Sequence, residues 1–257
     1  MIPVGLVYGG LILTLLAGIS LLRPPAFLGI RTRRQAASFV GFGLVVAIAG
    51  WTLPANETRV GTSRTQLDQF APSYQFNETH SIRVRAPRDR VYQAIKAVTA
   101  DEILLFRTLT WIRRLGHSGP ESILNAPGQL PLLEVATRTS FLLLSEDVNR
   151  EIVVGTAVMV PRGFHPERRP SPEDFRAVHE AGFVLAAMNF LVEDAGPGAC
   201  IVTTETRAYA TDASTQRRLA AYWRTIYPGS ALIRRMWLRT IKKRAEAAPA
   251  ASVPDIN

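Results

Sequence analysis

Residues 203–212, TTETRAYATD, decide the fold, because they read as a β-strand that runs directly into a long basic helix. A strand sends residues i and i+2 to the same side of a sheet, so the carboxylate of Glu205 and the guanidinium of Arg207 are neighbours. Pointing inward, they would form a paired polar handle for a ligand headgroup, since buried charges must be paired. Pointing outward, they form a structural or surface pair, which is the interpretation we favour.

The segment behind this strand predicts a helix from about residue 214 to residue 247, with Asp212 or Ser214 as its N-cap. Pro228 and Gly229 predict a break or a kink, because proline lacks an amide hydrogen and clashes with the preceding turn. Arg and Lys cover much of the helix surface. A solvated basic face is the simplest interpretation, and contact with anionic lipid headgroups is the next. Nucleic-acid binding is not expected, because no readout module is recognised.

The segments upstream predict an antiparallel sheet with two short helices. In residues 76–87, FNETHSIRVRAP, Ile82 and Val84 alternate with arginines, which is typical of a half-buried strand. Residues 88–115 read as two short helices broken near Thr99. Two hairpins follow, the first around the turn VNR and the second around AGPG, and the strand of residues 203–212 belongs to the second. A loop with four prolines separates the hairpins and ends in a short helix.

This element order, with the blocks APRDRVYQAI, TETRAYATD and YWRTIYPGSALIRRMWLRTIKKRAE, resembles a bacterial branch of the START-like or SRPBCC superfamily from Phe76 to about Ala247. The resemblance implies an α+β helix-grip fold, in which a curved antiparallel sheet wraps the C-terminal helix. It also implies an elongated apolar cavity that binds lipids, sterols, polyketides or plant hormones, and a few members are cyclases. Fold alone does not settle function.

Such a cavity would be lined by one face of the strands and the inward stripe of the last helix. Aromatic residues and methionines suit an adaptable apolar pocket, but the same side chains can simply fill a core. The candidate ligand-binding residues are Met188, Phe190, Tyr209, Tyr222, Trp223 and Ile226, with Glu205 and Arg207 as the polar pair.

No catalytic residue, metal or cofactor is expected from the sequence. The chain has no nucleophile elbow, no zinc-protease motif and no phosphate-binding glycine loop, and its single cysteine, Cys200, lies in an apolar strand. Histidines flank the proline-rich loop next to acidic residues, which is a possible acid/base arrangement at a cavity mouth. These residues are His165, Glu167, Glu173, Asp174 and His179.

The first fifty residues predict a membrane hairpin. Residues 2–22 contain no charged side chain, residues 36–53 are similarly apolar, and either length crosses a hydrocarbon core of roughly 30 Å. The rival interpretation of the first segment, a signal peptide, lacks its basic n-region. Arg23, Arg31, Arg33 and Arg34 between the segments place this loop in the cytoplasm by the positive-inside rule. Gly5 and Gly9 form a G-x-x-x-G match, although glycine is common in membrane helices anyway.

The sequence therefore predicts four parts: a transmembrane hairpin (1–54), a linker (55–75), a START-like domain (76–247) and a disordered tail (248–257). A net charge of +9 favours anionic partners such as phospholipid headgroups. We expect a two-span protein of the bacterial cell membrane with its C-terminal domain outside the cytoplasm. We expect it to bind membrane lipid or another hydrophobic small molecule without chemistry. The alternatives are a cyclase or dehydratase acting on a hydrophobic substrate, and a structural partner in a membrane complex.

Overall fold

The computed structural model describes residues 2–22 and 32–247. The chain divides into two compact units, the first being Met1–Asn56 with Ala220–Tyr227 and the second Glu57–Leu219 with Pro228–Asn257. The expected arginine loop, including Arg23 and Arg31, and the expected tail lie outside the described residues. The boundary predicted after residue 54 lies close to the one that follows Asn56.

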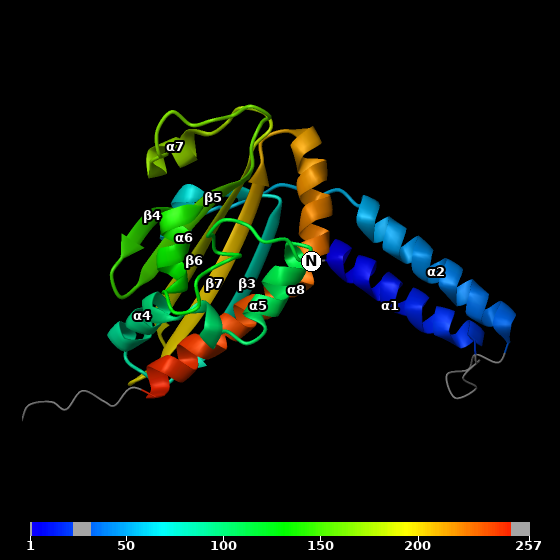
Figure 1. Ribbon diagram of the computed structural model, residues 1–257, viewed down its shortest axis with the longest axis horizontal. Coiled ribbons are helices and arrows are strands. Elements are labelled where there is room, and N and C mark those ends of the chain that lie inside the picture. Colours follow the sequence, from blue (N-terminus) through cyan, green and yellow to red (C-terminus); the bar gives the residue numbers. More distant parts are fainter. Residues whose placement is uncertain (1, 23–31, 248–257) are drawn as a thin grey trace, which may run out of the picture. The chain divides into compact units, whose positions relative to one another are not determined.

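Two helices, α1 (Ile2–Leu22) and α2 (Arg33–Thr52), form the hairpin of the first unit (Figure 1). Each is long and apolar enough to cross a membrane, with a mean hydropathy of 2.1 and 1.5, a composition that signal sequences and buried core helices also reach. A capping box between Thr32 and Gln35 begins α2. This pairing satisfies backbone donors that the first turn leaves without a partner.

The two helices approach most closely at small residues. A Cβ atom on Gly10 would lie 2.5 Å from the backbone nitrogen of Ala47, and one on Gly43 would lie 2.8 Å from the carbonyl oxygen of Gly10. Glycine is required at these positions because a side chain would push the backbones apart. A Cβ atom on Gly5 or Gly9 would meet nothing within 4 Å, so the G-x-x-x-G match does not mark the contact.

A break or a kink was predicted at Pro228. The helix α8 (Ala213–Ala247) continues through this residue, so a break is wrong, and a kink stays a prediction. Proline leaves the carbonyl of Arg224 without its helical donor. Within the first unit, the hydroxyl of Tyr8 donates to that carbonyl at 2.9 Å, and the guanidinium of Arg224 donates to the carbonyl of Trp51 at 2.5 Å. The lost backbone bond is therefore replaced by a side-chain bond.

The second unit is built on a five-stranded antiparallel sheet in the order β3-β7-β6-β5-β4. The strands are β3 (Phe76–Val84), β4 (Leu142–Asp147), β5 (Glu151–Met159), β6 (Val184–Asp194) and β7 (Cys200–Ala210). Both predicted hairpins are present, and the predicted α+β fold class, an antiparallel sheet against a long C-terminal helix, is confirmed. Asp212 caps α8, since its carboxylate accepts from the amides of Ser214 and Thr215.

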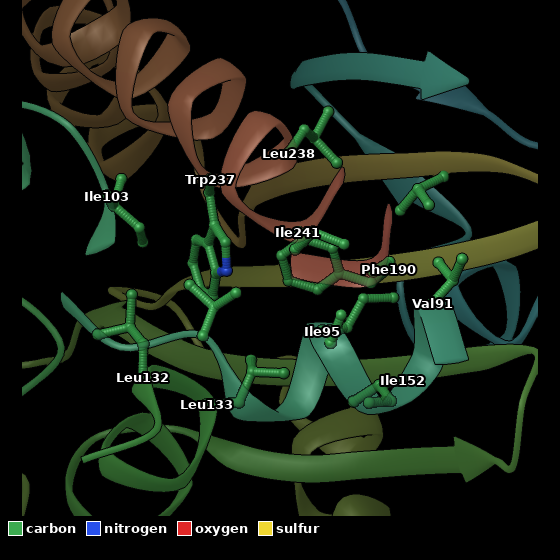
Figure 2. Packing of buried hydrophobic residues seen from close by; sticks show 14 of the residues in the cluster. Val91, Ile95, Ile103, Leu132, Leu133, Ile152, Phe190, Trp237, Leu238 and Ile241 are labelled. Carbon is green, nitrogen blue, oxygen red and sulfur yellow. The ribbon is translucent and has the colours of Figure 1, made fainter. Parts of the chain in front are cut away.

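One face of the sheet packs against helices. They are α4 (Arg88–Ala97), η2 (Ala100–Glu102), α5 (Phe106–Arg113), α6 (Leu132–Thr139) and the C-terminal part of α8. The rings of Phe190 and Trp237 meet edge to face, 4.9 Å apart, and Ile95 and Ile241 lie beside them (Figure 2). We call this the α8 face. It is a filled hydrophobic core at these residues.

The opposite, outer face is covered by α3 (Gln66–Phe70) and α7 (Pro172–Ala177). The segment predicted as a linker (55–75) contains regular structure, including two short strands, β1 (Thr58–Arg59) and β2 (Ser73–Tyr74). Leu67 is fully buried against Val153 and Ala187 of the sheet. Burial of Leu67 holds this part of the predicted linker to the domain, and the bounds of the linker stay a prediction.

Candidate functional site

A cavity of about 790 Å³ lies at the outer edge of the sheet. β4 pairs with β5 only as far as Leu142 and Gly155, so β5 has no neighbour on that side beyond this point. The proline-rich loop and α7 close over the space. Its apolar lining comprises Phe141, Leu142, Ala157, Val160, Phe164, Phe175, Val178, Phe183 and Leu185. This size and lining suit a hydrophobic small molecule.

Packing of aromatic rings shapes the cavity. The rings of Phe164 and Phe183 meet edge to face with centroids 5.0 Å apart. A Cβ atom on Gly155 would lie 2.9 Å from the ring of Phe175 and 2.6 Å from Leu144, so glycine lets Phe175 lie directly on the strand. Phe175 is held there because Ser171 and Asp174 form a capping box that begins α7.

The charged residues that line this cavity are Glu167, Arg168, Arg169 and Asp174. Asp174 is ion-paired with Arg168 at 2.8 Å. The hydrogen bond from the backbone of Ser171, then the bond from Arg168, hold the pKa of Asp174 below its ordinary value. A carboxyl group that stays ionised at neutral pH is not suited to act as a general acid.

A second cavity, of about 330 Å³, shares Phe175, Val178 and Leu185 with the first. Its polar lining includes Arg59, Gln69, Ser73, Arg176, His179, Arg207 and Tyr209. No Asp or Glu lines it within the described part of the chain. The side chains of Arg59 and His179 make no hydrogen bond or ion pair in residues 2–22 and 32–247. This rim is suited to an acidic group.

Arg207 occupies the floor of the second cavity and is largely buried. It donates to Asp68 at 2.7 Å and to Glu205 at 2.8 Å, and its guanidinium lies 5.0 Å from the ring centroid of Tyr74. Burial lowers the pKa of Arg207, but the hydrogen bonds to Glu205 and Asp68 outweigh burial and raise it above its ordinary value. Glu205 and Arg207 thus lie on the outer face, and Arg207 joins β7 to α3.

A second carboxylate fastens the same segment. Glu151 is fully buried and accepts hydrogen bonds from the backbone amides of Gln66 and Leu67, at 2.7 Å and 3.2 Å, at the start of α3. Its Oε1 also accepts from the side-chain amide of Asn189 at 2.7 Å. A buried carboxylate is tolerated because its acceptor sites are filled.

The structure does not bring the eight predicted ligand-binding residues together. Met188 and Phe190 lie in the core of the α8 face, whereas Glu205, Arg207 and Tyr209 lie on the outer face. The other three belong to the segment that groups with the hairpin, and they are Tyr222, Trp223 and Ile226. Arg207 and Tyr209 line the second cavity. Ligand binding by any of the eight stays a prediction.

Residues of the proline-rich loop and α7 line the larger cavity, where the sequence had predicted residues of the strands. Phe164, Phe175 and Phe183 line the larger cavity, and none was a candidate. The spacing S-x-x-D at Ser171 and Asp174 was the available signal, since it announces a helix start. Of the weighed acid/base residues, Glu167 and Asp174 line the first cavity and His179 the second, while His165 and Glu173 line neither.

A buried polar cluster also lies on the α8 face and was not predicted. His80 Nε2 is 2.7 Å from Glu78 Oε1, and Ser230 donates to the other oxygen of Glu78 at 3.0 Å. The guanidinium of Arg234 lies 3.7 Å from the same carboxylate, and burial lowers the pKa of Arg234. The cluster lines neither described cavity.

Comparison with known proteins gives distant structural likenesses. No family model and no curated protein matches the chain. A hypothetical protein from Helicobacter pylori is 9% identical and has a TM-score of 0.34, and the match covers 73% of this chain and 98% of that one. CalU16 from Micromonospora echinospora is 15% identical with a TM-score of 0.24, covering 66% and 84%.

Norcoclaurine synthase from Thalictrum flavum, solved with dopamine and hydroxybenzaldehyde, is 11% identical with a TM-score of 0.26, and the match covers 75% of this chain and 98% of that one. At such identities and TM-scores, none of the three carries an argument about what this chain binds. A function for this chain is therefore argued from the geometry of its two cavities.

Proposed function

We propose that the protein is anchored in a membrane by its α1–α2 hairpin and binds a hydrophobic small molecule without chemistry. The observation that carries this proposal is the apolar cavity of about 790 Å³ at the outer edge of the sheet. Its volume falls within the range of roughly 300–1,000 Å³ that is usual for small-molecule sites. The length and apolarity of α1 and α2 support the anchor.

The ligand class we propose is an amphiphile with an acidic group. Its apolar part occupies the larger cavity, and its acidic group lies at the second cavity, against Arg59, Arg176 and His179. The support is the shared wall of Phe175, Val178 and Leu185, which makes the two cavities neighbours. The arginines of the loop between the spans favour a cytoplasmic loop, and hence a ligand-binding domain outside the cytoplasm.

A cavity-filling variant tests the proposal. Ala157 is an exposed wall residue of the larger cavity, so Ala157→Trp fills the space without entering the core. Val148→Trp, in the turn at the other end of the β4–β5 hairpin, is the matched control. Full-length protein would be released from detergent in native mass spectrometry and extracted for bound small molecules.

A discrete apolar species is expected with wild type and with Val148→Trp, and it is expected to disappear with Ala157→Trp. Retention of the same species by Ala157→Trp would place its binding elsewhere. If wild type shows only the mass of the protein without ligand, before and after incubation with mixed lipids, ligand binding is contradicted. The structural-partner alternative would then be favoured.

An enzyme of the cyclase or dehydratase kind is the second candidate. The buried contact of 2.7 Å between His80 and Glu78 favours it, because it is an acid/base pair. The pair lies on the α8 face, and an enzyme acting in the outer-edge cavity would have to use other groups. His80→Gln tests whether the pair has a catalytic role, because an enzyme that used it would lose turnover. Ligand capture and turnover equal to those of wild type would remove the support for this candidate.

A further inference from the structure

A cluster of apolar side chains is exposed at the surface around α5. Phe106 and Thr110 are buried, whereas Trp111 and Ile112 of α5 are exposed and large leucines are exposed next to both of its ends, although a solvated surface would carry polar residues there. We call the exposed set the α5 patch: Leu104 (65% exposed), Leu105 (45%), Trp111 (56%), Ile112 (53%) and Leu115 (83%). Contiguous exposed apolar residues of this kind mark interaction surfaces.

The backbone holds the α5 patch in a defined geometry. Leu105 and Leu115, which bracket α5, have φ angles of 62° and 52°, in the left-handed region that bulky residues rarely adopt. Gly116 follows with φ of 77°, and a Cβ atom there would lie 3.1 Å from the indole of Trp111. The turn after α5 therefore rests on the ring of Trp111 and keeps it at the surface.

The part of α8 that contacts the chain just before the α5 patch carries cationic side chains. Thr240 donates to the carbonyl of Glu102 at 3.1 Å, and Arg244 pairs with the carboxylate of Glu102 at 2.8 Å, which joins α8 to the chain just before Leu104. Arg239 and Lys243 are exposed at the adjoining positions. Neither has a carboxylate partner in the described part of the chain.

We propose that the α5 patch, with Arg239 and Lys243, is a contact surface for a bilayer that contains anionic lipid. Interfacial segments insert Trp and Leu side chains at the boundary between headgroups and acyl chains while basic residues bind the headgroups. A single chain that carries two helices of bilayer length has such a surface within reach. This contact rests on the proposed membrane anchor and does not depend on the cavity ligand. An experiment can therefore contradict the membrane contact of the α5 patch without contradicting ligand binding.

The test uses the full chain in lipid nanodiscs. Cys200 is the only cysteine and is buried, so Cys200→Ser provides a background for single labels. An environment-sensitive fluorophore would be placed at Leu104→Cys or Leu115→Cys. The matched control is Val148→Cys, because Val148 is as exposed as Leu104, at 65%, and lies in the β4–β5 turn.

The measured quantity is quenching by spin-labelled lipid. In anionic nanodiscs we expect quenching at positions 104 and 115 that is several-fold stronger than at 148. Arg239→Gln combined with Lys243→Gln is expected to reduce it toward the level seen in zwitterionic nanodiscs. Without labels, bromolipid quenching of wild type should exceed that of Trp111→Phe, which keeps the test valid if Cys200→Ser misfolds.

Three outcomes overturn the proposal. Positions 104 and 115 quenched no more than 148 would leave the α5 patch in water. A blue-shifted fluorophore that spin-labelled lipid does not quench would show that protein covers the patch, either a second copy or another chain. Equal quenching in anionic and zwitterionic lipid would remove the role of Arg239 and Lys243 and with it the anionic surface.

Discussion

Arg207 Nη1 lies 2.7 Å from Asp68 Oδ1, which joins β7 to α3 across 139 positions of the chain. Both side chains are largely buried, at 8% and 6% exposure. The bond gives the segment after the second apolar helix a fixed place on the outer face of the sheet.

Removing Asp68 should destabilise the second unit strongly. Asp68→Ala leaves Arg207 with one carboxylate, Glu205, and opens the cap of α3, and loss of a buried partner costs about 3 kcal/mol of unfolding free energy. The measurement is thermal or denaturant unfolding of the full chain in detergent. Asp194→Asn, which breaks the exposed pair with Arg88, is the control and should cost under about 1 kcal/mol. Equal losses of unfolding free energy in the two variants would contradict a larger contribution from the buried bond between Asp68 and Arg207.

Adding one methyl group at Gly155 should disturb the larger cavity. The Cβ atom of Gly155→Ala would lie 2.6 Å from Leu144 and 2.9 Å from Phe175, so the ring must move, at a cost of about 1–3 kcal/mol. Gly61→Ala is the matched control, because nothing lies within 4 Å of its Cβ position. The measurement is the unfolding midpoint of each variant. If Gly155→Ala has the same midpoint as wild type, Phe175 is not packed on the strand.

Neutralising the rim of the second cavity should weaken binding of acids selectively. Arg59→Gln combined with Arg176→Gln removes two cations from a cavity whose described lining contains no Asp or Glu; the nearest carboxylate to Arg176 is that of Glu173, at 3.6 Å. Affinity for a fluorescent long-chain carboxylic acid is expected to fall about tenfold, equivalent to about 1.4 kcal/mol, with its methyl ester unaffected. Titration by fluorescence measures both. A parallel loss for acid and ester would point to a change of shape instead.

The N-cap of α8 predicts a pH dependence at the acidic end. The side-chain hydroxyl of Thr215, then backbone amides, hold the pKa of Asp212 at about 2. Because this folded-state pKa is below the unfolded value of about 3.9, the contribution to stability is present above about pH 4 and is lost as the pH falls through about 2. Asp212→Ala should therefore be less stable than wild type at pH 6, and the difference should shrink toward pH 2. A difference that is constant with pH would contradict the assignment.

Local patterns were sufficient to predict the sheet. Alternation at Ile82 and Val84, and the AGPG turn between β6 and β7, depend on neighbours in sequence, and each appears in the structure. The break at Pro228 did not appear, because Tyr8 supplies the donor that proline lacks. That contact joins residues far apart in the chain, which no local rule describes.

The site was less predictable, for two physical reasons. Which face of a strand a side chain occupies depends on the whole sheet, and the candidate set mixed Met188 from the α8 face with Tyr209 from the outer face. The short helix α3 was missed because its place depends on Glu151, 85 positions from Gln66, which accepts its first backbone amides. Its own sequence offers only Leu67 and Phe70 as apolar residues, which is too little for a periodic signal.

The attachment of α3 to the sheet also determines how the domain would respond to tension from the proposed membrane anchor. β3 is an edge strand, and a chain that entered it from an open tether would peel it away one hydrogen bond at a time. Instead, the bonds from α3 to Glu151 and Arg207 would transmit the force to β5 and β7, which have strand neighbours on both sides. The load is therefore shared by several strands, and the weakest direction of the sheet is protected.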